Sequence, residues 1–476
     1  LCTEDQGGYF IIRGNERCII LQESLRKNYI FVFDTSARNT LIHCEVRSCH
    51  ESKLRSTSTM KMFLMMKKKE MTPNIKVELP FLNTNITLVT LIRFLKDDES
   101  ISVEEIKECI CRIVRNELRE DPDCESMVSF MKQIIYCVDD YVTLDELYNS
   151  VGQHGTKARN FDQRKKYIQH LLINECLPHI GLDGSEEVRC KKMYFICKML
   201  VRIIKVHFKK ISFNDRDDYK NKRVHTCGTL LSLLFRQLYR KFLKYIRGTL
   251  IKNVISGKFI NIAEIVDNRQ ITSALLYSMS TGNWSVSKNN ATMKVGISQL
   301  MSKMNKLSII SHIRRANTPS CRDGKRTEIR QLHTSHRGIF CCFETPEGSS
   351  CGLLKAVSMM ATVRQLVPAK IIIDWILISF REEITEFDPY STQSMIWVNG
   401  IVVCCIRDNV LVDDVVNRFR ESRRKQLLGK YISISKVDND IHLNSDEDCL
   451  VRPLLVVSKL PEFVHIMYNY TKYHQT

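Results

Sequence analysis

A loop-rich and strongly basic stretch, residues 311–357, places the tightest constraint on how this chain folds. The turn signals Thr318-Pro319 and Asp323-Gly324 interrupt it, and an apolar run leads into the sequence Glu-Thr-Pro-Glu-Gly at 344–348. Because proline fixes φ and glycine frees it, such a backbone can come close to a ligand. Clustered cations on a backbone of this kind indicate phosphate binding. The cations are Arg314, Arg315, Arg322, Lys325, Arg326, Arg330 and Arg337.

The distribution of charge agrees with a polyanionic partner. The chain has 476 residues, which predicts roughly three domains, and a net charge of +18. Between Lys191 and Lys252 there are 17 Lys and Arg against 3 Asp, whereas Asp97–Glu146 has 15 acidic against 5 basic residues. Such a field suggests nucleic acid on one surface and protein or solvent on another. The alternative is that both stretches are solvated helix faces.

Several classes of protein are disfavoured. The 19 cysteines contain no C-x-x-C pair, so reduced thiols in an intracellular protein are expected rather than a disulfide scaffold. His333 and His336 precede Cys341 and Cys342 without the spacing of zinc ligands. The longest apolar stretches are too short to cross a bilayer, and no leader opens the chain, so no membrane partner is expected. No G-x-x-x-x-G-K-[ST] motif occurs, which disfavours a P-loop ATPase or helicase.

Hydrophobic patterns predict strands, then helices, then strands again. Gly7–Glu23 predicts a β-hairpin, and Ser56–Thr72 an edge strand protected by its lysines. Helical periodicity covers most of the chain from Asn83 to Tyr148 and recurs at Thr229–Ile251 and Val295–Arg315. In Thr229–Ile251 the expected inner face is Leu230, Leu231, Leu234, Leu238, Phe242 and Ile246. The last part predicts a basic helix at Leu411–Gln426 among strands at Ile371–Ser379, Ser394–Cys405, Tyr431–Val437, Ile441–Leu443 and Leu450–Val457.

Four motifs make the sequence resemble a known family. RRANTP, RDGK, RQLHTSHRG and ETPEGSSCGL follow one another over about forty-five residues, as in the fork region of the second-largest (β-like) subunit of multisubunit DNA-directed RNA polymerases. The nearest type is the polymerase II subunit and its relatives in large DNA viruses. The family has Cys-Pro shortly before ETPEG, where this chain has Cys341-Cys342. The missing initiator Met and an opening that soon reads as a strand suggest an internal fragment.

The resemblance implies an α+β multidomain fold. A β-rich protrusion would begin at 1–59 and resume at 231–280, with a mainly helical lobe inserted at 60–230. The fork would occupy 281–352. A mixed α/β external domain would begin at 353 and be truncated at 476.

The resemblance also implies the nucleic-acid contacts. Thr318–Ile329 would be fork loop 2, where the downstream duplex opens, so Arg322, Lys325 and Arg326 are expected to contact the nucleic-acid backbone. Arg314, Arg315 and Arg337 are further candidates. Either of the first two could instead pair with a buried carboxylate.

Two other groups of residues belong to the implied site. Arg330, Gln331 and Glu344 would lie near the active centre, with Glu344 orienting a basic residue near the RNA 3′ end. The alternative is a turn carboxylate paired with Arg330 or Arg337. Fork loop 1 would comprise Thr281, Gly282, Asn283 and Trp284, although a turn capped by Trp also fits ordinary packing.

The implied partners are DNA template and non-template strands, the RNA–DNA hybrid, nucleoside triphosphates, the largest subunit and smaller subunits. No catalytic residue and no metal ligand are expected here, because the largest subunit would hold most of the Mg²⁺ coordination in the assembled enzyme. The expected location is the nucleus, or a cytoplasmic viral compartment or virion for a viral protein. The alternative function is a non-catalytic nucleic-acid-binding protein or decayed copy that retains the fold.

Overall fold

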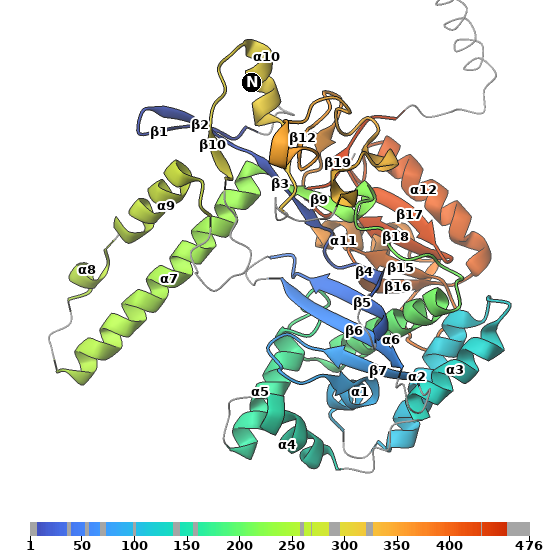
Figure 1. Cartoon of the computed structure of the whole chain (residues 1–476). Coiled ribbons are helices and arrows are strands. Elements are labelled where there is room, and N and C mark those ends of the chain that lie inside the picture. Colours follow the sequence, from blue (N-terminus) through green and yellow to red (C-terminus); the bar gives the residue numbers. More distant parts are fainter. Residues whose placement is uncertain are drawn as a thin grey trace, which may run out of the picture. The chain divides into compact units, whose positions relative to one another are not determined.

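The chain divides into two units, each assembled from separate stretches of sequence. Unit 1 comprises residues 1–24, 217–364 and 448–476, and unit 2 comprises residues 25–216 and 365–447 (Figure 1). In this computed structural model the described residues are 7–35, 40–52, 57–66, 73–98, 101–136, 143–155, 160–257, 261–267, 269–284, 296–319, 327–429 and 431–454.

Unit 1 is built on short strands from distant parts of the chain. Its three-stranded sheet has the order β1-β2-β10, and its four-stranded sheet the order β12-β11-β3-β9. A further pair, β13 and β19, is antiparallel. The strands are β1 (Tyr9–Ile12), β2 (Asn15–Ile19), β3 (Leu21–Leu25), β9 (Lys222–His225), β10 (Ser298–Leu300), β11 (Arg315–Asn317), β12 (Leu354–Ala356), β13 (Thr362–Val363) and β19 (Leu450–Val451).

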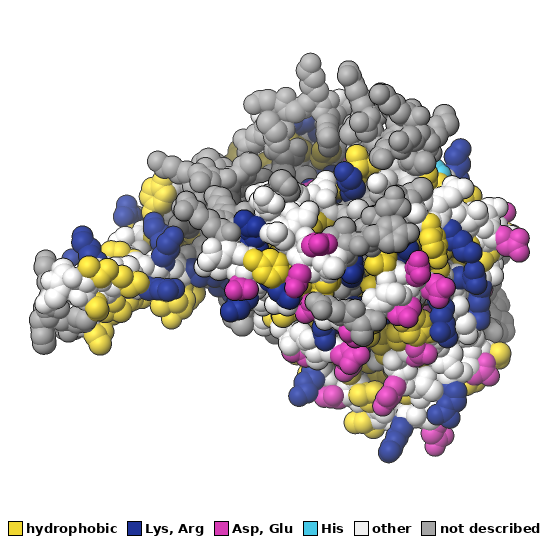
Figure 2. All heavy atoms as spheres, turned by 90° about the horizontal axis from the view of Figure 1, so that it is seen from below, with side chains coloured by type: hydrophobic (Ala, Val, Ile, Leu, Met, Phe, Trp, Pro, Cys, Tyr) yellow, Lys and Arg dark blue, Asp and Glu magenta, His cyan; other side chains and the backbone are white. Residues whose placement is uncertain are grey.

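The helices of unit 1 are dominated by α7 (Cys227–Ile255), which contacts α8 (Ile262–Ile265) and α9 (Arg269–Thr281). Leu230, Leu234 and Leu238 are buried on one face of α7, at the spacing of successive helical turns. Beyond them basic and apolar side chains lie side by side on the surface of these helices (Figure 2). The remaining helices are α10 (Lys306–Ile313) and the 3₁₀ turns η1 (Tyr219–Asn221), η2 (Glu328–Arg330), η3 (Thr334–His336) and η4 (Gly348–Ser350).

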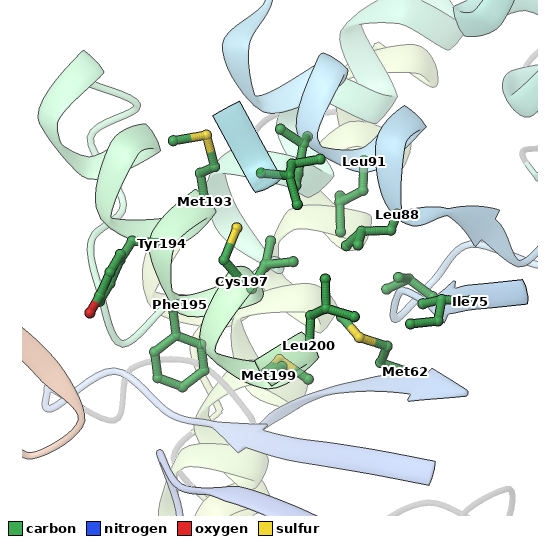
Figure 3. Packing of buried hydrophobic residues seen from close by; sticks show 14 of the residues in the cluster. Met62, Ile75, Leu88, Leu91, Met193, Tyr194, Phe195, Cys197, Met199 and Leu200 are labelled. Carbon is green, nitrogen blue, oxygen red and sulfur yellow. The ribbon is translucent and has the colours of Figure 1, made fainter. Parts of the chain in front are cut away.

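Unit 2 contains a five-stranded sheet in the order β4-β5-β6-β7-β8, with α6 (Glu186–His207) packed against it. Because almost all of α6 from Lys192 to Val206 is buried, this helix lies in the centre of the core. Side chains from β6, β7, α1 and α6 meet there (Figure 3). The strands are β4 (Ile30–Asp34), β5 (Thr40–Ser48), β6 (Ser58–Met66), β7 (Pro73–Glu78) and β8 (Ile86–Thr87). The other helices are α1 (Leu88–Lys96), α2 (Val103–Leu118), α3 (Cys124–Tyr136), α4 (Leu144–Gly155) and α5 (Phe161–Asn174).

A second sheet of unit 2 has the order β14-β16-β15-β18-β17 and packs with two helices around its own core. Its strands are β14 (Ile384–Thr385), β15 (Met395–Val398), β16 (Ile401–Ile406), β17 (Ser433–Val437) and β18 (Asp440–Asn444). The helices are α11 (Ala369–Ser379) and α12 (Val412–Arg424), with the 3₁₀ turn η5 (Asn409–Leu411) between β16 and α12. Sheets and helices are present in both units, which agrees with the α+β multidomain fold expected from the sequence.

The structure confirms the hairpin at the start and the long helix, and it corrects three predicted elements. β6 is not an edge strand, because β5 and β7 pair with its two sides; the lysines at 67–69 lie outside the described residues. The stretch predicted as a strand at Ile371–Ser379 is helix α11, since Ile372 and Ile376 are buried one turn apart. The helix predicted at 295–315 is reduced to α10, and strand β10 precedes it.

The inner face of α7 is also smaller than predicted. Only Leu230, Leu234 and Leu238 are buried, whereas Leu231, Phe242 and Ile246 are half-buried. Among the described residues, no helix is both long enough and apolar enough to span a membrane.

Candidate nucleic-acid interface

The site predicted from the sequence lies in unit 1 and is organised by β11. This strand pairs in parallel with β3, where Ala316 lies opposite Leu21, and antiparallel with β12. Directly after the strand, the backbone N–H of Thr318 donates to the carbonyl of Leu353 at 2.9 Å. The backbone is therefore fixed up to the start of the basic segment 318–329, of which Arg322, Lys325 and Arg326 lie outside the described residues.

A buried carboxylate on β3 holds this end of the segment. Glu23 is 3% exposed. One of its oxygens, Oε1, accepts from Lys355 Nζ at 3.0 Å and from the hydroxyl of Tyr219 at 3.3 Å. The other, Oε2, accepts from Thr318 Oγ1 at 2.8 Å and lies 3.5 Å from Lys222 Nζ. A buried carboxylate is tolerated in this way because its charge is paired and its oxygens are hydrogen-bonded.

The other end of the segment is held through Arg330. Its Nη1 donates to the carbonyls of Ser349 and Cys351, each at 2.8 Å. Gly352 has a φ of +73°, and a Cβ there would lie 2.6 Å from the Cα of Arg330. Only glycine allows the two backbones to approach so closely. Arg330 is thus fixed against the turn that carries the ETPEG motif, and the adjacent Gln331 is exposed.

Glu344 is paired within the same unit. Its Oε1 accepts from the hydroxyl of Ser311 and lies 3.7 Å from Nη2 of Arg315. The sequence suggested Arg330 or Arg337 as the partner of Glu344, whereas the ion pair in the structure is with Arg315. The side chain of Glu344 remains 43% exposed, so the pair stays open to solvent.

The guanidinium of Arg314 is bound by backbone carbonyls. Its Nη2 donates to the carbonyls of Ser358 and Ala361, both at 2.7 Å, and its Nε donates to Val357 at 3.4 Å. The guanidinium therefore holds the turn after β12. The sequence offered a buried carboxylate as the alternative partner, and backbone carbonyls take that place.

Arg337 is exposed directly after η3. The next residue, Gly338, has a φ of +72°, and a Cβ there would lie 2.6 Å from Nη1 of Arg452. Two cations from distant parts of the chain, Arg337 and Arg452, thus lie beside Gly338.

The turn predicted as fork loop 1 is anchored by packing. Trp284 is buried, and its Nε1 donates to the carbonyl of Leu230 at 3.0 Å. Gly282 has a φ of +78°, and a Cβ would lie 2.6 Å from the carbonyl oxygen of Ser298. The hydroxyl of Thr281 accepts from the N–H of Asn283 at 3.2 Å. The loop that follows, 285–295, lies outside the described residues.

Sequence reasoning missed the network around Glu23. The signal was a Gln22-Glu23 pair inside an otherwise apolar run, a position at which a carboxylate needs a partner. Nothing in the sequence identified Lys222 and Lys355 as those partners, because they lie about 200 and 330 positions further along the chain.

Among the described residues, no three or more His, Cys, Asp or Glu side chains are grouped so that they could hold a metal ion.

Three models of known families match the chain, all described as domains of RNA polymerase Rpb2. Domain 2 matches residues 26–225, domain 3 residues 299–363 and domain 4 residues 396–458. The match to domain 4 covers residues of both units. The basic segment 318–329 falls within the match to domain 3.

Similar proteins support the same family. The chain is 32% identical over 470 residues to DNA-directed RNA polymerase II subunit RPB2 of Schizosaccharomyces pombe, covering 97% of this chain and 37% of that protein. It is 31% identical over 468 residues to DNA-directed RNA polymerase II subunit 2 of Arabidopsis thaliana (96% and 38%). It is 26% identical over 473 residues to DNA-directed RNA polymerase subunit Rpo2 of Saccharolobus solfataricus (96% and 39%). The chain thus spans well under half the length of these curated relatives.

All three relatives are subunits of DNA-directed RNA polymerases. Within that class the chain belongs to the Rpb2 family, the second-largest subunits. The resemblance found in the sequence is confirmed.

Proposed function

We propose that this chain works as part of the second-largest subunit of a DNA-directed RNA polymerase, forming one side of the DNA cleft and the fork near the active centre. The observation that carries the proposal is that both ends of the basic segment 318–329 are fixed to the fold. Thr318 is held through Glu23, and Arg330 through Ser349 and Cys351. A charged loop on a rigid base can present cations at a defined place without reading bases.

The basic segment would contact the nucleic-acid backbone. Arg322, Lys325 and Arg326 are the proposed contacts, because a cleft through which strands must slide needs sequence-independent binding of phosphate. Arg337 adds an exposed cation, and Arg315 adds one that Glu344 keeps in place. Arg314 is the weakest candidate of the set, since three carbonyls occupy its guanidinium.

Arg330, Gln331 and Glu344 are proposed to lie near the active centre. A carboxylate beside nucleic acid is repelled by phosphate, so its useful role is to orient a cation. The ion pair with Arg315 makes that arginine the residue that Glu344 orients. The residues Thr281, Gly282, Asn283 and Trp284 would hold the base of fork loop 1.

The proposed order of domains is protrusion, lobe, protrusion, fork and external domain. The boundaries taken from the sequence are 1–59, 60–230, 231–280, 281–352 and 353–476. The first of these boundaries falls inside β6, and the chain passes between the two units at Ser24 and Leu25.

The proposed function depends on the assembled enzyme. We propose as partners the two DNA strands, the RNA–DNA hybrid, nucleoside triphosphates, the largest subunit, which would hold most of the Mg²⁺ coordination, and smaller subunits. Because the relatives include polymerase II subunits, the proposed location is the nucleus.

Replacing Arg322, Lys325 and Arg326 by Ala in the assembled polymerase tests the proposal. The open complex should lose stability, and the slope of log K against log salt should become shallower by up to about 3, because each phosphate contact contributes about 0.9. The measurement is open-complex lifetime over a series of salt concentrations, together with elongation rate.

The control removes three exposed cations from α12 and its end instead, Arg420, Arg424 and Lys425. It should leave the salt dependence unchanged. Equal salt slopes for the wild type and the variant of segment 318–329 would remove this segment from the account of DNA binding.

A further inference from the structure

Unit 2 contains a cavity of about 90 Å³ that is bounded by α6, by residues 26–30 at the start of β4, and by strands β15 and β18. Since one water molecule needs about 10–15 Å³ of such space, the cavity has room for several waters or for one small polyatomic ion. Asp438 forms part of the wall, lies 3.9 Å from Lys205 Nζ and has a side chain that is 60% exposed. The cavity is therefore open to solvent there, and a ligand can enter.

Two carboxylates in the wall of the cavity are already occupied by donors. Glu117 accepts from Lys198 Nζ at 2.6 Å and from the hydroxyl of Tyr194. Asp440 Oδ2 accepts from Lys198 Nζ at 2.9 Å and from Trp397 Nε1 at 3.1 Å. Both carboxylates are thus paired and hydrogen-bonded within the fold, which leaves them little capacity to bind a cation or a neutral donor.

Donors in the same wall are not matched by acceptors. Arg202 donates through Nη2 to the hydroxyl oxygen of Tyr29 at 2.8 Å, and among the described residues it forms no ion pair with a carboxylate. The O–H of Tyr29 itself has no acceptor in the described part of the chain. The ring of His442 stacks on Trp397 at 5.6 Å between centroids and forms no hydrogen bond with any described residue. Three side chains thus line the cavity with N–H and O–H groups that lack an acceptor in the fold.

The wall is also positively charged around these donors. Arg26 and Arg202 both lie over the ring of Tyr29, with Cζ 4.7 Å and 5.0 Å from its centroid, so the two guanidiniums lie within about 10 Å of each other. Burial, and then three neighbouring cations, lower the pKa of His442 to about 3. These cations are Lys198, Arg26 and Arg202. An anion in the cavity would offset the repulsion between these charges.

We propose that this cavity binds a phosphate group. Arg202 would be its main charged donor, because the planar N–H groups of a guanidinium suit phosphate oxygens. Tyr29 and His442 would donate the O–H and N–H that lack another acceptor. These donors come from α6, from the segment before β4 and from β18, so they surround a ligand, which favours a tetrahedral oxyanion over a planar carboxylate. The site lies within unit 2 and does not depend on the proposed function of segment 318–329.

The test observes binding at His442 itself, because a chain with a net charge of +18 also attracts phosphate to its surface. The 476-residue chain is labelled with ¹³C in its histidine rings, and the signal of His442 is assigned by its absence from His442→Gln. Free phosphate and the terminal phosphate of a nucleotide present similar oxygens, so inorganic phosphate is added in one titration and metal-free ATP in another, both at constant ionic strength. A saturable shift of the His442 signal is expected. A shift with inorganic phosphate identifies the free ion as the ligand, and a shift with ATP alone identifies a phosphate carried by a larger molecule.

Arg202→Gln should weaken this binding at least about tenfold, because it removes a charged hydrogen-bond donor. Arg202→Lys keeps the charge but not the planar donors and should weaken binding less. Arg189→Gln is the matched control on the same helix, since Arg189 donates to the carbonyl of Lys96 at 3.4 Å and does not line the cavity. It should bind as wild type does. Urea unfolding of each variant without phosphate separates loss of binding from loss of the fold.

Two results would overturn the proposal. One is a wild-type chain in which neither inorganic phosphate nor ATP shifts the His442 signal saturably. The other is equal binding by wild type and Arg202→Gln. If Arg202→Gln does not fold, Tyr29→Phe takes its place, because it removes one donor and should weaken binding severalfold. Equal binding by wild type and Tyr29→Phe would then overturn the proposal in the same way.

Discussion

At the scale of single residues, Gly352 decides how closely the turn that carries the ETPEG motif approaches the backbone of Arg330. Its positive φ and its closeness to the backbone of Arg330 are independent constraints. Gly348, four residues earlier, has a φ of +81° but nothing within 4 Å of where a Cβ would lie. The two glycines therefore separate the cost of backbone conformation from the cost of a steric clash.

Gly352→Ala should destabilise the protein more than Gly348→Ala. Both variants force a side chain into the left-handed region, which costs about 1–3 kcal/mol. Only the first also pushes a methyl group into the backbone of Arg330, which adds about 1–3 kcal/mol. Urea unfolding of the two variants measures the difference. Equal free energies of unfolding would mean that the backbones of Gly352 and Arg330 do not pack this closely.

At the scale of elements, Lys198 shows how α6 is fixed within unit 2. Its Nζ lies 2.6 Å from Oε2 of Glu117 on α2 and 2.9 Å from Oδ2 of Asp440 on β18. Burial alone would lower the pKa of Lys198, but the two carboxylates outweigh it and raise that pKa. One ammonium group thus connects a helix of one core with a strand of the other.

Lys198→Met should lower the free energy of unfolding by about 3–5 kcal/mol, because it leaves two largely buried carboxylates without their cation. Lys191→Met is the control on the same helix. Lys191 pairs with Glu187 one turn away, whose side chain is 73% exposed, and such pairs contribute about 0.3–0.5 kcal/mol. Urea unfolding followed by tryptophan fluorescence compares the variants, and similar losses would rule out a special role for Lys198.

Local patterns predicted those elements whose signal is contained in a few neighbouring residues. The hairpin of β1 and β2 follows from an apolar run on each side of Arg13-Gly14, both of which have positive φ. The predicted strand at Ile371–Ser379 is helix α11, because an unbroken apolar run fits a buried strand and a buried helix equally well. The predicted edge strand β6 is central, because β5 and β7, which are distant from any local signal within it, pair with its two sides.

The sequence predicted where in the chain the candidate site lies, but not the residues that hold it in place. The motifs located the basic segment and the turn around Glu344. The partner of Glu344 and the partners of Glu23 come from residues far away in the sequence, and no periodicity encodes such pairs. The proposed contact residues were thus easier to identify from the sequence than the partners of Glu23 and Glu344.

At the scale of the whole molecule, each unit contains a histidine that burial keeps neutral. His336 in unit 1 has a pKa lowered to about 4 by burial and by nearby Lys355, and His179 in unit 2 has a pKa lowered to about 3 by burial. His179 shares a hydrogen bond of 2.8 Å with Ser48 Oγ and contacts the edge of Phe195. Because an unfolded chain binds protons at these positions near pH 6.5, acid should weaken both units.

His179→Asn should reduce the loss of stability between pH 7 and pH 5. The folded pKa lies below the unfolded value, so the contribution is complete above about pH 6.5 and is lost as the pH falls towards about 3. Over this interval one such histidine accounts for about 2 kcal/mol. Urea unfolding of the 476-residue chain at both pH values, followed by the fluorescence of Trp375 and Trp397 in unit 2, measures the loss.

His170→Asn, which changes an exposed histidine of α5, should lose as much stability as wild type. If His179→Asn also loses as much as wild type, His179 is already protonated or solvated in the folded protein, and the acid sensitivity of unit 2 has another source.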